Sequence, residues 1–150
     1  DVVKTFGGHA MAAGLTIERD GFEDFSRAFE RTVRAHCTPE TFEKIVLTDG
    51  GLAPDEISER LCREVEHQIW GQGFEAPLFA NEFTVLSQTL VKDAHLKMKL
   101  ALGGSVYDAI FFRHTEALSG TPKLAYRPDI NEFRGRRTVQ LVVEAADDPA

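Results

Sequence analysis

The chain has 150 residues, of which 43% are hydrophobic and 27% charged, a composition that suits one compact domain or a small domain with an attached piece. Its two cysteines, Cys37 and Cys62, allow at most one disulfide, which excludes a disulfide-stapled secreted scaffold and favours free thiols. No apolar run approaches the roughly 20 residues of a membrane span, and residues 1–6 lack the pattern of a signal peptide. We therefore expect a soluble, cytoplasmic protein.

Charge is unevenly distributed along the chain, whose formal net charge is −7. Residues 18–75 carry seven Lys and Arg against fourteen Asp and Glu, whereas residues 88–140 carry nine against five, which gives −7 and +4 for the two stretches. Basic charge in one half is compatible with a nucleic-acid-binding face there and a solvated acidic helix layer elsewhere. Ordinary surface charge explains the same asymmetry equally well.

The chain opens with small residues and continues into a helix. Residues 7–14, Gly-Gly-His-Ala-Met-Ala-Ala-Gly, have the composition of a tight turn that feeds a closely packed helix. Residues 15–17 are expected to form a short strand. Apolar residues then recur at helical spacing from Phe22 to Val33, which predicts an amphipathic helix that ends near Cys37.

A second helix is expected after a short strand. Residues 44–48 have the pattern of a strand that ends at an Asp-Gly-Gly turn. Acidic residues follow Pro54, and apolar residues recur at spacing four from Ile57 to Ile69. These features predict a helix over about residues 54–70.

The pattern of the second half of the chain indicates a small β-barrel. Its runs are short, alternating or β-branched, and turn signals separate them at regular intervals, as in a barrel rather than a βαβ sheet. The expected strands are residues 83–90, 95–102, 106–113, 122–126 and 138–144.

The first candidate site is Gly7, Gly8 and His9. Glycines let backbone amides approach a phosphate closely, and an imidazole can donate a hydrogen bond to its oxygens. A structural turn with an incidental histidine explains these three residues as well.

The second candidate site lies in the barrel half, where basic residues alternate with aromatic ones. Basic groups neutralise phosphates, and aromatic rings stack on bases in single-strand binders. Phe111 and Phe112 could contact a base, although one of them is needed for the core. A glycine turn at residues 134–137 could project several guanidinium groups together. The candidate DNA-binding residues are His95, Lys97, Lys99, Arg113, Tyr126, Arg127, Arg134, Arg136 and Arg137.

Other chemistry is weakly supported by the sequence. Cys62 and His67 are five residues apart, and Cys37 has only the adjacent His36, so no cysteine and histidine spacing suggests a metal site. The carboxylates lie on helix faces, where solvation is the ordinary explanation. We therefore expect no metal site and no nucleophilic catalytic constellation in these residues.

The eight-residue string at residues 7–14 resembles the glycine-histidine motif of the DHH-associated domain, which is found beside DHH phosphoesterase domains and in related alanyl-tRNA editing proteins. Further segments, in the same order, resemble the carboxy-terminal part of the RecJ exonucleases, a family that degrades single-stranded DNA from the 5′ end. These segments are residues 70–79, 95–100, 109–112 and 126–135. The resemblance extends from Phe6 to about Asp147.

This resemblance implies an α+β fold. Residues 1–37 would complete a DHH-associated α/β domain, and residues 38–150 would form a five-stranded OB-fold barrel with an added helix. The implied function is the single-stranded-DNA-binding part of a 5′ to 3′ exonuclease, a phosphodiester hydrolase used in DNA repair and recombination. Gly7, Gly8 and His9 would contact a substrate phosphate.

The resemblance also implies that catalysis lies outside these residues. The family's catalytic aspartates and DHH triplet hold Mg²⁺ or Mn²⁺ in an amino-terminal domain, and no Asp-His-His occurs here. Two-metal hydrolysis needs such a cluster to position the ions and activate water. We expect a fragment of a longer chain that is inactive alone and binds no cofactor itself.

Two other functions remain open. One is a different DHH-family phosphoesterase or editing protein, which would share the residues 7–14 motif but not the barrel. The other is a barrel that docks a protein partner, such as the acidic tail of single-strand-binding protein, on the same basic surface. Charge alone does not separate an acidic peptide from DNA.

Overall fold

The computed structural model describes residues 2–147 and divides the chain into two compact units, Asp1–Ile45 and Val46–Ala150. We call them the first and the second unit. The first unit contains β1 (Val3–His9), β2 (Ala12–Ile17), the 3₁₀ turns η1 (Arg19–Gly21) and η2 (Pro39–Phe42), and α1 (Phe22–His36). The second unit contains α2 (Glu59–Glu66), β3 (Phe79–Glu82), β4 (Thr84–Val91), β5 (His95–Leu102), β6 (Ser105–Phe111), β7 (Lys123–Phe133) and β8 (Arg136–Asp147).

An antiparallel hairpin of β1 and β2 opens the first unit. This corrects the expectation that residues 7–14 form a tight turn feeding a helix, because they form the tip of the hairpin instead. Gly8 lies opposite Ala13, and a Cβ at Gly8 would stand only 2.8 Å from the Ala13 Cβ. The missing side chain therefore permits close strand pairing, and a run of small residues without helical periodicity remains extended.

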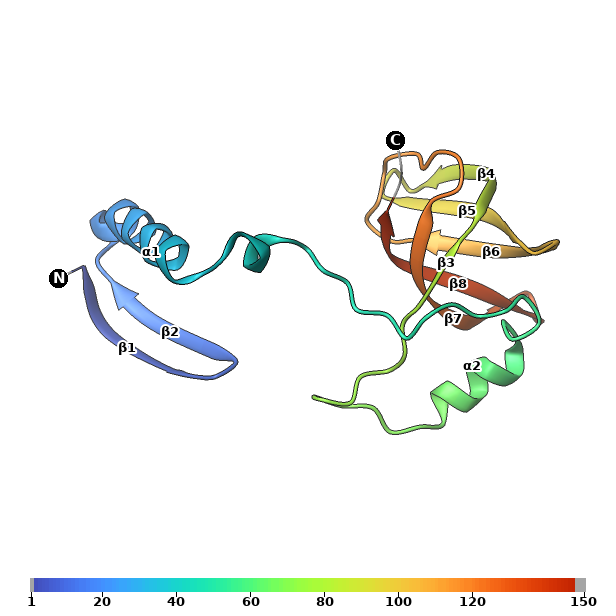
Figure 1. Cartoon of the computed structure of the whole chain (residues 1–150), viewed down its shortest axis with the longest axis horizontal. Helices are drawn as coiled ribbons and strands as arrows, with labels where there is room; N and C mark the ends of the chain where they lie inside the picture. The colour runs from blue at the N-terminus through green and yellow to red at the C-terminus, as the bar shows by residue number, and fades with distance from the viewer. Residues whose placement is uncertain (1, 148–150) are drawn as a thin grey trace. The chain divides into compact units, whose positions relative to one another are not determined.

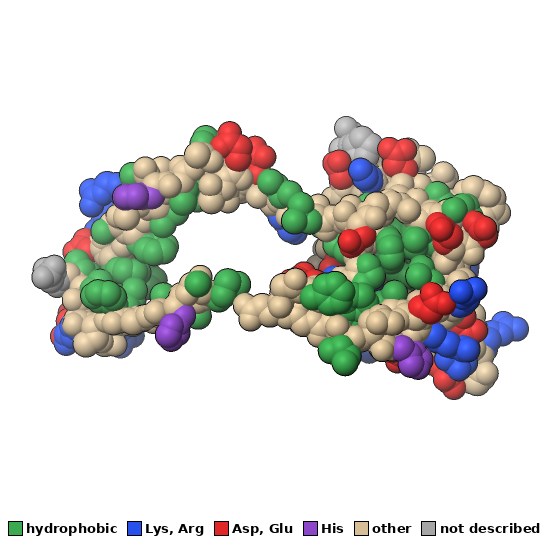
Figure 2. Space-filling model, turned by 60° about the horizontal axis from the view of Figure 1, so that its bottom comes forward, with side chains coloured by type: hydrophobic (Ala, Val, Ile, Leu, Met, Phe, Trp, Pro, Cys, Tyr) green, Lys and Arg blue, Asp and Glu red, His purple; other side chains and the backbone are tan. Residues whose placement is uncertain are grey.

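Helix α1 follows the predicted pattern and ends at His36, with Cys37 as its C-cap before Thr38 and a proline. Its apolar stripe is only partly covered, because Phe22 and Phe29 are exposed. None of residues 2–45 is buried. Figure 2 shows hydrophobic side chains at the surface of this unit. The first unit by itself thus lacks a closed hydrophobic core.

The second unit is a closed barrel (Figure 1). Its strand order is β3-β7-β8-β6-β5-β4, and only Phe83 separates β3 from β4. The two segments are therefore halves of one bent strand that pairs with β7 through its first half and with β5 through its second. Counted this way, five strands follow the order 1-2-3-5-4-1, with the third and fifth parallel. This is the five-stranded OB-fold barrel, as predicted.

Two expectations about the connecting segments are wrong. Residues 44–48 are not a strand, and α2 is shorter than the predicted helix over residues 54–70. Ser58 caps α2 by accepting a hydrogen bond from the backbone N–H of Leu61. Residues 54–58 before this cap form turns and bends, with the Glu56 N–H donating to Ala53 O at 3.0 Å and the Tyr107 hydroxyl donating to Pro54 O at 2.6 Å.

Residues 49–52 run along the free edge of β3. The backbone N–H of Asp49 donates to Leu78 O at 2.8 Å, and that of Ala80 donates to Gly50 O at 2.8 Å. The side chain of Asn81 brackets Leu52, accepting from its N–H and donating to its carbonyl. This segment thus covers an edge that would otherwise expose unpaired backbone groups.

Tyr126 lies at the centre of the second unit. Its side chain is fully buried, and its hydroxyl donates to Asn81 Oδ1 at 2.8 Å. Burial in apolar surroundings raises the pKa of Tyr126 well above its usual value. The core around it consists of Ile57, Phe83, Leu96, Met98, Leu100, Tyr107, Ala109, Leu118, Leu124, Leu141 and Val143.

Candidate nucleic-acid interface

Strand β5 separates a buried face from a basic one. Leu96, Met98 and Leu100 are buried, whereas Lys97 and Lys99 between them are exposed. This alternation follows from the two-residue repeat of a strand and was predicted from the sequence. The two lysines therefore lie on the outer face of the barrel.

The neighbouring strand β6 balances only one of these charges. Lys99 Nζ lies 2.8 Å from Asp108 Oδ1, in the cross-strand pair that joins β5 to β6. Lys97 lies opposite Ile110 and makes no ion pair within residues 2–147. Lys97 is thus the more available cation for an anionic ligand.

At one end of β5 and β6, an aromatic and basic corner is formed by His95, Phe112 and Arg113. The ring centroids of His95 and Phe112 are 5.2 Å apart in an edge-to-face arrangement. The backbone N–H of Arg113 donates to His95 Nδ1 at 3.0 Å. Because Nδ1 accepts this bond, the neutral ring carries its proton on Nε2. Phe112 remains half exposed.

The turn between β7 and β8 forms a second basic corner. Arg134 and Gly135 make a two-residue loop in which both residues have positive φ, as a type I′ hairpin turn requires. The guanidinium of Arg134 lies 5.1 Å from the centroid of the exposed Phe133 ring. Arg136, the first residue of β8, is also exposed.

Arg137 beside this turn is already paired. Its Nε atom lies 3.3 Å from Glu59 Oε1 at the start of α2, and both side chains are partly exposed. The prediction of several guanidinium groups projecting together therefore fits Arg134 and Arg136 better than Arg137.

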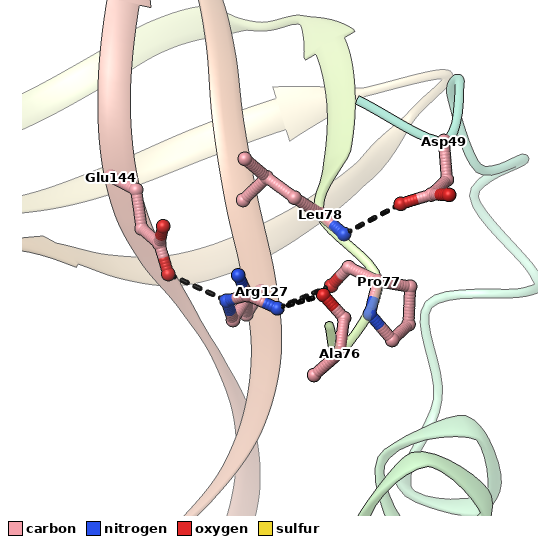
Figure 3. A network of polar contacts seen from close by, with 6 residues as sticks. All are labelled: Asp49, Ala76, Pro77, Leu78, Arg127 and Glu144. Carbon is pink, nitrogen blue, oxygen red and sulfur yellow. Dashed lines mark hydrogen bonds and ion pairs between the residues drawn. The ribbon is translucent and has the colours of Figure 1, made fainter. Parts of the chain in front are cut away.

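Arg127 occupies an architectural position (Figure 3). Its Nε donates to Glu144 Oε1 at 2.6 Å, and its Nη1 donates to the carbonyls of Ala76 and Pro77. The guanidinium thus ties β7 and β8 to the segment between α2 and β3. Tyr126, also expected to contact DNA, is fully buried and cannot present its ring to a ligand, whereas Arg127 keeps 32% of its side chain exposed.

The sequence alone did not predict that the side chains of Asp49 and Asn81 hold residues 49–52 against β3. Asp49 accepts a hydrogen bond from the Leu78 N–H at 2.9 Å (Figure 3), and Asn81 bonds both Leu52 and Tyr126. Only the Asp-Gly-Gly turn after residues 44–48 hinted at this contact. No local pattern indicates that these residues meet others about 29 positions away along the chain.

In the first unit, the structure places Gly7, Gly8 and His9 at the end of β1. A Cβ at Gly7 would meet open space, whereas one at Gly8 would collide with Ala13. His9 is exposed. The geometry thus gives Gly8 a role in strand pairing, and it leaves Gly7 and His9 accessible.

Clusters of metal-ligating side chains and membrane-spanning helices are both absent from the part of the chain that the structure describes. Within residues 2–147, no group of three or more His, Cys, Asp or Glu side chains could hold a metal ion. No helix in that same range has the length and apolarity to cross a bilayer.

Cys62 is buried, which raises the pKa of its thiol and disfavours the reactive thiolate.

The strand order, the parallel pair of β6 and β8 and the exposed basic face of β5 define the second unit as an OB-fold module. Residues 48–145 match the family model described as the RecJ OB domain. The chain therefore belongs to the RecJ OB domain family.

Two curated relatives are similar to almost the whole chain. The single-stranded-DNA-specific exonuclease RecJ of Escherichia coli (strain K12) is 40% identical over 93% of this chain and 26% of its own length. The exonuclease of the same name from Haemophilus influenzae is 38% identical over 96% of this chain and 27% of its own length. The chain thus spans about a quarter of these relatives.

A solved structure has the same fold. RecJ of Thermus thermophilus in complex with Mg²⁺ matches 99% of this chain and 24% of its own, with a TM-score of 0.74 and 20% sequence identity. A second structure of that protein is a complex with Mn²⁺. The described residues of this chain contain no cluster of side chains that could hold either ion.

Proposed function

We propose that this chain is the single-stranded-DNA-binding part of a RecJ-type 5′ to 3′ exonuclease, a cytoplasmic enzyme of DNA repair and recombination. The main support is the outer face of β5, where Lys97 stands without an acidic partner in residues 2–147, together with the exposed Arg113 and Arg134 at the two corners. The names of the relatives, which specify single-stranded DNA, support the same substrate.

The exposed lysines and arginines of the barrel act by neutralising phosphates. Each lysine or arginine that pairs with a phosphate releases condensed counterions. The logarithm of the binding constant therefore falls with the logarithm of the salt concentration, with a slope of about 0.7 per contact on single strands. We call this the salt slope. The ion pair between Lys99 and Asp108 lowers the contribution of that lysine. Lys97, Arg113, Arg134 and Arg136 therefore supply most of the attraction.

We further propose that residues 1–37 complete a DHH-associated domain whose remaining elements come from other parts of the protein. The exposed apolar side chains of the first unit would then be covered, and Gly7 and His9 would lie near a substrate phosphate. Catalysis would rest on a site with Mg²⁺ or Mn²⁺ elsewhere in the enzyme. The chain alone is then expected to bind DNA without cleaving it.

The test is fluorescence anisotropy of labelled single-stranded and duplex DNA across a salt series. The variant Lys97→Gln with Arg136→Gln removes two exposed cations. Its matched control, Arg27→Gln with Arg60→Gln, changes the net charge equally at cations that already pair with Asp24 and Glu64.

Preference for single strands, and a salt slope reduced by about 1.4 in the first variant only, would support the proposal. An equal loss of DNA affinity in both variants would show that net charge alone attracts the DNA. No binding at low salt would overturn the proposal.

The same cations could attract an acidic peptide such as the tail of single-strand-binding protein. Lys97 and Arg136 are exposed to either kind of ligand. Competition between unlabelled acidic peptide and labelled DNA separates the two functions. Displacement at comparable concentrations would indicate overlapping sites, whereas binding of the peptide alone would make the face a protein-docking surface.

A further inference from the structure

We infer that Phe112 and Phe133 are base-stacking residues and that each forms a contact corner with the arginine that follows it. This inference rests on the proposed function and adds the side chains that hold bases. The two corners are Phe112 with Arg113, after β6, and Phe133 with Arg134, at the end of β7.

The two corners share the same local structure. Each phenylalanine lies at a strand end or directly after it and is exposed, 50% at Phe112 and 64% at Phe133. Each following arginine has left-handed backbone, with φ of 56° at Arg113 and 52° at Arg134. An aromatic ring and a guanidinium are thus presented together at both places.

Neither ring is required by the core. Leu96, Met98 and Leu100 fill the barrel beneath β5, and Phe111, the neighbour of Phe112, packs against the core instead. Phe112 makes an edge-to-face contact with the His95 ring, and the Arg134 guanidinium lies over one face of the Phe133 ring. Because Phe112 is 50% exposed and Phe133 64% exposed, part of each ring remains accessible to a ligand.

The backbone at the two arginines is unfavourable for a side chain of this kind. Left-handed backbone is strained at most non-glycine residues, and the first position of a type I′ turn favours Asn, Asp or Gly. Arginine at both corners therefore contributes something other than turn stability. A cation beside an exposed ring matches single-strand binding, where rings stack on bases and cations follow the phosphates.

The distance between the corners suits a short single strand. Phe111 pairs with Val143 on β8, and Phe133 pairs with Arg136, so the corners lie about seven residues apart along β8. At about 3.3 Å per residue this is roughly 23 Å. A stacked strand with a rise of about 3.4 Å would span it with about seven nucleotides, within the site size of about 4–16 for OB folds.

The experiment compares a thymidine oligonucleotide of about ten nucleotides, longer than the expected site, with an abasic oligonucleotide of the same length, which keeps the phosphates and lacks bases. Phe112→Leu and Phe133→Leu remove the ring and keep an apolar side chain. Phe74→Leu is the matched control, because Phe74 is an exposed phenylalanine that stacks on Trp70. Thermal unfolding checks that each variant is folded.

We expect each corner variant to bind the thymidine strand about fivefold or more weakly than wild type. Affinity for the abasic strand should be unchanged, and the control should match wild type on both strands. Arg113→Gly and Arg134→Gly should lower the salt slope by about 0.7 each without loss of stability, because glycine tolerates the positive φ.

The outcomes separate this inference from the function on which it rests. If wild type binds single strands but the corner variants bind the thymidine strand equally well, the stacking assignment is wrong and the proposed function stands. If wild type prefers the abasic strand or binds both equally, bases make no contact and the assignment is wrong. If wild type binds neither strand at low salt, both proposals fail.

Discussion

Replacing Asn81 by alanine should destabilise the second unit by about 3 kcal/mol, since three hydrogen bonds of about 1 kcal/mol each end on this side chain. Asn81 Oδ1 accepts from the Leu52 N–H at 3.0 Å and from the Tyr126 hydroxyl at 2.8 Å, and Nδ2 donates to the Leu52 carbonyl at 3.1 Å. Tyr126 is fully buried, so water cannot replace the lost acceptor.

A double-mutant cycle isolates one of these bonds. Tyr126→Phe removes only the hydroxyl and should cost about 1 kcal/mol, because Asn81 keeps its two bonds to Leu52. The Asn81→Ala and Tyr126→Phe double variant should then show a coupling of about 1 kcal/mol.

The assay is urea unfolding followed by the fluorescence of Trp70, the only tryptophan, which lies in the second unit. This role of Asn81 is refuted if the free energy of unfolding of Asn81→Ala lies within about 0.5 kcal/mol of wild type, a difference typical of neutral surface substitutions. It is also refuted if the cycle shows no coupling, since the hydroxyl would then have another partner.

Three further predictions concern the second unit. Burial raises the pKa of Cys62, so the unfolded thiol ionises first and stability should fall as the pH rises above about 8.5; Cys62→Ala should flatten this fall in urea titrations on either side of that pH. Gly51→Ala would place a Cβ 3.0 Å from Ala80 O, and this clash should lower the Tm measured by calorimetry. A Tm equal to that of wild type would contradict the clash. Arg127→Ala should cost about 1–3 kcal/mol by freeing Glu144 and two carbonyls, with single-strand affinity nearly unchanged by anisotropy.

Local patterns were sufficient for most elements of the fold. The alternation from Leu96 to Leu100 correctly assigned a buried and an exposed face to β5. The helix from Phe22 and its end before Thr38 followed from periodicity and a proline. These features are short-range, so the chain encodes them within a few residues.

Two kinds of feature were predicted incorrectly. Residues 44–48 have strand composition but find no partner strand, and a strand exists only where a neighbour completes its hydrogen bonds. Residues 7–14 have the composition of a turn, yet they pair across a hairpin. In both cases the deciding partner lies outside the local pattern.

In the candidate site too, local sequence predicted some features, whereas others depend on residues far along the chain. The sequence located the basic residues of the barrel and placed Lys97 and Lys99 together on one exposed face. It could not tell available cations from occupied ones, because the partners of Lys99 and Arg127 lie 9 and 17 positions away along the chain.

The sequence by itself determined helix α1, the five strands of the barrel, the buried and exposed faces of β5 and the resemblance to an exonuclease family. Tertiary structure alone decided that Tyr126 is buried, that Arg127 pairs with Glu144 and that Asn81 hydrogen-bonds the buried Tyr126 hydroxyl. It also revealed two exposed rings, Phe112 and Phe133, at matching corners. The physical reason is that periodicity is a local property, whereas hydrogen-bond partners and solvent exposure are set by residues that meet only when the barrel closes.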